Sequence, residues 1–128
     1  MLKNDKLTFN RVQIIGNLGR ESELKYTNDG RAWVRTSIAV YQGDGKPKMW
    51  LQVKAFAQKA GSGWDDSVPV ALAACAKGAR VQLTGKLVYE EREYNGVTYR
   101  DWGIVLYQAP VDAPRKDERS RDEDEPDF

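Results

Sequence analysis

The sequence predicts an all-β fold, a five-stranded Greek-key barrel with one short helix between its third and fourth strands. Alternation of apolar and polar residues with period two runs through most of residues 8–109, as in half-buried strands. A single alanine-rich segment, 69–77, begins with a proline and is followed by a glycine, which is typical of a helix. An Asn-Gly pair at 95–96 separates two long alternating runs and predicts a hairpin.

The first strand is expected over residues 8–18, the second over 32–41 and the third over 49–56. The second and third are joined by a glycine-containing turn and are expected to form a hairpin. Every second residue in them is apolar or small, which predicts one side facing a core. That side consists of Val34, Thr36, Ile38, Val40, Met49, Leu51, Val53 and Ala55.

The helix is expected over residues 69–77, ended by Gly78. The fourth strand follows over 79–94, with Val81, Leu83 and Leu87 facing inward, and the fifth covers 97–109. Three strands, a helix and a long hairpin follow one another in an OB-fold, a five-stranded Greek-key barrel.

The chain divides by charge into a basic domain, residues 1–110, and an acidic tail, residues 111–128. The domain has 16 Lys and Arg against 11 Asp and Glu, whereas the tail has 4 against 8. The tail is too polar to bury a core and is expected to be disordered. A basic body with an acidic tail suits a protein that binds a polyanion and carries a separate partner-binding segment.

Catalysis has little support in the composition. The chain has no histidine and one cysteine, Cys75, so zinc sites and nucleophile–histidine pairs are excluded or unsupported. No phosphate-binding glycine loop occurs, and we expect no enzymatic activity, cofactor or metal. The longest apolar stretch, 68–76, is far shorter than the roughly 20 residues of a membrane helix. With a single cysteine, these features predict a cytoplasmic protein that does not enter a membrane.

The second side of strands two and three carries the strongest functional signal, because it combines aromatic rings with cations. The rings are Trp33, Tyr41, Trp50 and Phe56, and the cations between them are Arg35 and Lys54. Bases of single-stranded nucleic acid stack on such rings for about 1–3 kcal/mol each, while cations bind the phosphates. The candidate phosphate contacts, all on the non-core side of their strands, are Arg11, Arg35, Lys54, Arg80 and Lys86.

The alternative is that the rings are covered by the helix, by the long hairpin or by a second subunit. The hairpin also carries Glu90, Glu91 and Glu93, which would repel phosphate. The competing hypothesis is therefore an OB-fold protein–protein adaptor in a replication or recombination assembly. Its interfaces would use Trp33, Trp64 and Trp102.

Four blocks of sequence resemble the bacterial single-stranded DNA-binding proteins, in order and spacing. They are NRVQIIGNLGR at 10–20, ELKYT at 23–27, WLQVKAF at 50–56 and KGARVQLTGKL at 77–87, and Gly30 and SIAV at 37–40 match as well. The resemblance covers about residues 8–108. It implies an OB-fold that coats single-stranded DNA during replication, recombination and repair, in association with the nucleoid. It also implies a homo-oligomer, usually a tetramer, although the residues leave a dimer open.

The resemblance further implies that Trp50 and Phe56 stack on bases, and Tyr94 loosely matches a third aromatic in the last hairpin. The acidic tail tip of the family recruits replication and repair proteins. Its counterpart here is Asp122, Glu123, Asp124, Glu125, Pro126, Asp127 and Phe128. An insertion at 61–64 and the unusual tail tip depart from the family pattern and suit a divergent member of phage or plasmid type.

Overall fold

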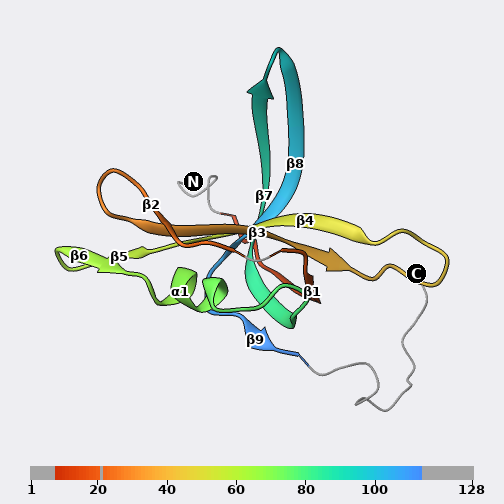
Figure 1. Ribbon diagram of the computed structural model, residues 1–128, viewed down its shortest axis with the longest axis horizontal. Coiled ribbons are helices and arrows are strands. Elements are labelled where there is room, and N and C mark those ends of the chain that lie inside the picture. Colours follow the sequence, from red (N-terminus) through yellow and green to blue (C-terminus); the bar gives the residue numbers. More distant parts are fainter. Residues whose placement is uncertain (1–7, 21, 114–128) are drawn as a thin grey trace, which may run out of the picture.

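The computed structural model describes residues 8–20 and 22–113, which form a closed five-stranded barrel (Figure 1). The barrel strands are β1 (Val12–Leu18), β3 (Ala32–Val40), β4 (Met49–Phe56), β7 (Arg80–Tyr94) and β8 (Val97–Leu106). They lie in the order β1-β3-β4-β8-β7, and β7 pairs back to β1 to close the barrel. Only the β4–β8 pairing in this ring is parallel. The predicted OB-fold is confirmed.

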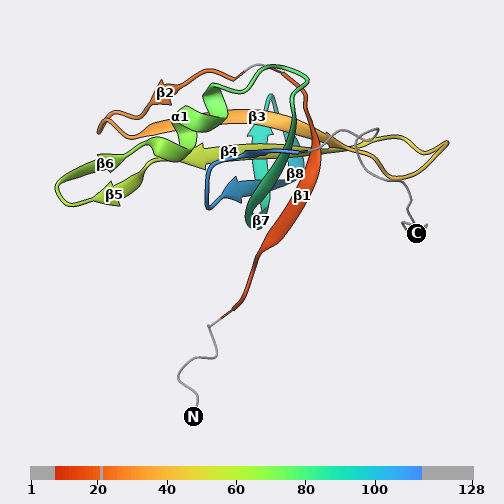
Figure 2. The same ribbon diagram turned by 90° about the horizontal axis from the view of Figure 1, so that it is seen from below.

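Smaller elements decorate the barrel. Strand β2 (Lys25–Tyr26) pairs with β3, and β9 (Val111–Asp112) pairs with β7. A separate hairpin of β5 (Gln58–Ala60) and β6 (Gly63–Asp65) precedes the helix α1 (Ser67–Ala73). The helix thus lies between the third and fourth barrel strands, as predicted. In Figures 1 and 2, β2 and the β5–β6 hairpin lie at the same end of the molecule.

The helix differs from its predicted bounds at both ends. It begins at Ser67, whose backbone N–H donates to the Asp65 carboxylate at 3.0 Å. Pro69 is therefore inside the first turn, where no intrahelical N–H donor is needed. The helix ends at Ala73, well before Gly78. Gly78 has a φ of +85°, and its N–H donates to the Leu18 carbonyl at 2.9 Å, so it turns the chain against β1 instead of ending the helix.

The core contains the side of β3 and β4 that alternation predicted, together with Val81 and Leu83 of β7. Its most buried large side chains are Val34, Ile38, Val53, Leu72, Val81, Leu83 and Ile104. Leu72 comes from α1 and joins the cluster of strand side chains. The buried hydroxyl of Thr36 is satisfied, because it donates to the Arg20 carbonyl at 2.9 Å.

Leu87, predicted to face inward, is instead 37% exposed. The reason is that β7 leaves the barrel just before it. At Gly85, an added Cβ would lie 2.2 Å from the carbonyl oxygen of Val105, so only glycine allows the strands to approach so closely there. Beyond this point β7 and β8 continue as a two-stranded projection, residues 88–103, here called the arm (Figure 1).

The turn at the tip of the arm is the predicted hairpin. Asn95 and Gly96 have φ of 54° and 79°, and Tyr94 pairs directly with Val97 across the turn. Two successive residues with positive φ match the twist of antiparallel strands, which explains the Asn-Gly sequence.

Residues 111–112, which composition assigned to the tail, are paired with the barrel. Val111 lies opposite Gln82 and Asp112 opposite Val81. The tail tip, Asp122 to Phe128, lies outside the described residues. Among the helices of the described part of the chain, none combines the length and apolarity needed to cross a membrane.

Candidate nucleic-acid interface

The outer face of β3 and β4 brings the predicted aromatic and basic side chains into one register. Trp33 lies opposite Phe56, Arg35 opposite Lys54, and Ala39 opposite Trp50. Paired residues point to the same side of a sheet, so these side chains share the face turned away from the core. The prediction that alternation places them there is confirmed.

Trp50 is the most open ring within the paired strands β3 and β4, at 58% exposed. Its position depends on small neighbours. Ala39 is opposite it, and a Cβ added at Gly19 would lie only 2.5 Å from its Cζ3 atom. The indole therefore lies against a glycine while much of its surface remains open, which is the arrangement a stacking platform needs.

Phe56 and Trp33 are half-buried and already contact each other. Their rings stack with centroids 6.1 Å apart and planes 14° from parallel. The guanidinium of Arg31 also lies 5.0 Å from the Phe56 centroid. These rings have partners within the chain, so base stacking on them stays a prediction.

Three predicted phosphate contacts lie in one register around the outside of the barrel. Arg35 on β3 is opposite Lys54 on β4. Lys54 and Lys86 on β7 both pair with Val105 on β8. Neighbouring strands are about 4.8 Å apart, so the path along the barrel wall from Arg35 to Lys86 is roughly 14 Å. We call Arg35, Lys54 and Lys86 the basic row.

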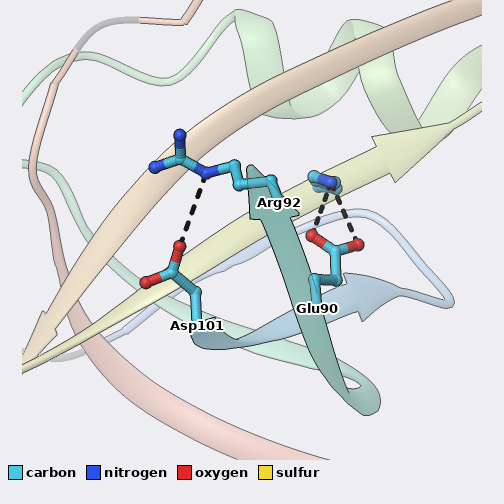
Figure 3. Close-up of polar contacts among 4 residues, drawn as sticks. Glu90, Arg92 and Asp101 are labelled. Atoms are coloured by element: carbon cyan, nitrogen blue, oxygen red, sulfur yellow. Dashed lines mark hydrogen bonds and ion pairs between the residues drawn. The ribbon is translucent and has the colours of Figure 1, made fainter. Parts of the chain in front are cut away.

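The arm reaches back to this row through an ion pair. The ammonium of Lys54 contacts both carboxylate oxygens of Glu90, at 2.8 and 3.0 Å, as drawn in Figure 3. The side chain of Lys54 is 22% exposed and that of Glu90 is 45% exposed. A phosphate that binds Lys54 must therefore compete with Glu90.

The other charges of the arm are mainly paired with one another. Arg92 lies 3.8 Å from Asp101, also drawn in Figure 3, and Arg100 lies 3.1 Å from Glu91. Arg92 additionally lies 4.9 Å from the Tyr99 ring. The charges of Glu90 and Glu91, which we expected to repel phosphate, are thus partly neutralised by neighbouring cations.

Four predicted residues lie apart from the Trp50 and Lys54 region or at its edge. Tyr41, 62% exposed, follows β3, and its hydroxyl donates to Asp44 in the β3–β4 loop. Tyr94 is at the tip of the arm. Arg11 is exposed just before β1, and Arg80 is half-buried on β7 opposite Asn17. Tyr94, Arg11 and Arg80 therefore lie apart from the basic row.

Sequence reasoning missed the hairpin that follows β4. Lys59 and Trp64 pair across the β5–β6 hairpin, and the Arg31 guanidinium lies 5.1 Å from the Trp64 ring. The only local signal was Trp64 itself, which was weighed as an interface residue. Trp102, weighed in the same way, contacts Tyr89 on the arm with centroids 4.7 Å apart. Within residues 8–20 and 22–113, no group of three or more His, Cys, Asp or Glu is placed to hold a metal.

Comparisons with known proteins agree with this fold. Two solved structures with the same fold are a Plasmodium falciparum SSB complex with ssDNA and the wild-type single-stranded DNA binding protein from Thermus aquaticus. The first has 18% identity and a TM-score of 0.60, and the match covers 81% of this chain and 92% of that one. The second has 23% identity and a TM-score of 0.61, and the match covers 84% of this chain but 41% of that one.

The chain therefore matches less than half the length of the Thermus aquaticus protein. A search of curated proteins found no match. The model of the single-strand binding protein family matches residues 9–106, which include every barrel strand. This chain belongs to the single-strand binding protein family.

Proposed function

We propose that this chain coats single-stranded DNA without sequence preference, using the outer face of β3 and β4. Binding of single-stranded DNA follows from membership of the family, and the proposal concerns the site and the mode. The observation that carries it is the exposed ring of Trp50, 58% accessible, beside the basic row.

The mode follows from the chemistry of these side chains. Every base has a π face, so a base can stack on Trp50 without its hydrogen-bonding edge being read. Arg35, Lys54 and Lys86 then bind the phosphates, which carry no sequence information. In this proposal Phe56 and Trp33 support a second base, and Arg11, Arg80, Tyr41 and Tyr94 contact DNA that continues around the barrel. Binding alone performs the function, with no reaction and no cofactor.

The test is the substitution Trp50→Ala, followed by titration with fluorescently labelled oligo-dT. Loss of one stacked base costs about 1–3 kcal/mol, or roughly 5- to 150-fold in affinity. The thermal midpoint should change little, because the ring is mainly exposed. Trp102→Ala is the matched control, since Trp102 is 54% exposed but lies on the arm. Equal losses in both variants would remove the support for this face.

Assembly and partner recruitment complete the proposal. We place the protein in the bacterial cytoplasm with the nucleoid, as a homo-oligomer, a tetramer by family resemblance or else a dimer. The acidic tip from Asp122 to Phe128 recruits replication and repair proteins.

The adaptor alternative has one specific observation in its favour, the exposed pair of Tyr89 and Trp102 on the arm. A protein that self-associates equally at low and high salt but does not bind oligo-dT would support it. Phosphate contacts, in contrast, make binding fall steeply with salt.

A further inference from the structure

Aromatic rings and cations alternate where the β2–β3 loop contacts the β5–β6 hairpin. Figure 2 shows these two segments at the same end of the molecule. Lys25 lies 5.7 Å from the Trp33 ring, which stacks on Phe56. Arg31 lies 5.0 Å from the Phe56 centroid and 5.1 Å from that of Trp64. Lys59 lies 4.9 Å from the Trp64 ring. We call these six residues the array: Lys25, Trp33, Phe56, Arg31, Trp64 and Lys59.

Backbone contacts hold the array in place from both sides. The indole N–H of Trp64 donates to the Asp29 carbonyl at 3.4 Å, which joins the hairpin to the β2–β3 loop. The Nε of Arg31 donates to the Ala57 carbonyl at 2.8 Å. Ala57 is the single residue between β4 and β5, so the array continues directly from the end of the Trp50 strand.

The array has more positive than negative charge. Its three cations face two nearby carboxylates, Asp29 and Asp65. A hydrogen bond from Thr27, aided by Arg31 and Lys59, lowers the pKa of Asp29, and hydrogen bonds from Ser67 lower the pKa of Asp65. In the described part of the chain, the two terminal nitrogens of Arg31 have no hydrogen-bond acceptor.

We propose that the array is a second phosphate site, which extends the DNA path beyond Phe56 onto the β5–β6 hairpin. Arg31 and Lys59 bind backbone phosphates of the strand that leaves the Trp50 face. Trp64 is a positioning residue, because its ring holds both cations at the surface while leaving their charge available. This inference rests on the proposed function and specifies how far the path extends.

Geometry supports the extension. Trp50 and Phe56 are six residues apart on β4, or about 20 Å along the strand. A short oligonucleotide can occupy that length alone, whereas a longer one must continue past Phe56. There it meets Arg31, at the end of the β2–β3 loop, and Lys59, the one cation in residues 58–65.

The experiment compares two oligo-dT lengths, about 6 and about 16 nucleotides, which span the site sizes of single OB-folds. The variants are Lys59→Gln and Trp64→Leu, and the matched control is Lys77→Gln, an exposed lysine outside the array. Affinity is measured at several salt concentrations, and thermal melting verifies folding. For the longer oligonucleotide, Lys59→Gln should reduce the salt slope of log K by about 0.7, one phosphate contact. Trp64→Leu should reduce the slope as well, although it removes no charge.

On the short oligonucleotide, both variants should have the affinity and the salt slope of the unmodified protein. If Lys59→Gln and Trp64→Leu have the same affinity and salt slope as Lys77→Gln on both oligonucleotides, the inference is overturned. The proposed function would remain intact. Failure of the unmodified protein to bind either length would instead overturn the proposed function. If Trp64→Leu does not fold, Lys59→Gln still decides between these outcomes.

Discussion

The ion pair between Lys54 and Glu90 predicts that a single substitution on the arm will tighten DNA binding. In Glu90→Gln the carboxylate that contacts Lys54 at 2.8 Å is lost, and the ammonium becomes available to a phosphate. The ion pair is partly exposed, so its contribution is at the upper end of surface pairs, about 1 kcal/mol. DNA no longer has to displace it, which corresponds to a gain of about fivefold in affinity.

The salt dependence gives a second, independent magnitude. Because Lys54 binds a phosphate with or without Glu90, the slope of log K against log salt should change by less than the roughly 0.7 of one whole phosphate contact. The assay is titration of labelled oligo-dT at several salt concentrations. Glu93→Gln is the matched control, because it removes the same charge from the same strand but alternates to the other face of the arm.

A double substitution isolates the contact. If Lys54 is the group released, Lys54→Gln should abolish the gain produced by Glu90→Gln. An equal gain in Glu90→Gln and Glu93→Gln would refute the reasoning, because it would show a general effect of net charge. The loss of the pair should lower the free energy of unfolding by no more than about 1 kcal/mol.

Three further predictions concern other parts of the chain. Gly19→Ala would place a Cβ 2.5 Å from both the Trp50 ring and the Ser37 hydroxyl, so the ring must shift and oligo-dT affinity should fall several-fold. Unchanged affinity would show that the ring position is unimportant. Deletion of residues 115–128 removes net negative charge and should leave oligo-dT affinity equal or higher, whereas a clear loss would disprove the separate role of the tail. Burial, with a smaller effect of Asp112, raises the pKa of the Cys75 thiol. Because only the thiolate reacts, iodoacetamide should alkylate Cys75 more slowly than free cysteine at neutral pH, and the rate should increase as the pH rises.

Much of the fold follows from local pattern. Alternation in 32–40 and 49–56 identified the core side, because period two is imposed by strand geometry itself. The same rule placed Trp50 and Lys54 on the opposite side. The Asn-Gly turn was equally readable, since its two positive φ angles restrict which residues can occupy it. The ends of the helix could not be predicted in this way, because Asp65 and the turn at Gly78 act through contacts outside the helical segment.

Local sequence pattern is sufficient to assign the side of a strand on which a residue lies, and hence to predict that aromatic and basic side chains share an outer face. Which side chains meet across that face depends on the tertiary fold. Glu90 contacts Lys54 over a separation of 36 residues, and Trp64 contacts Asp29 over 35. Such contacts depend on barrel closure and on the direction in which the arm and the β5–β6 hairpin leave the barrel. Periodicity contains no information about either, because it describes only the relation of a residue to its neighbours along one strand.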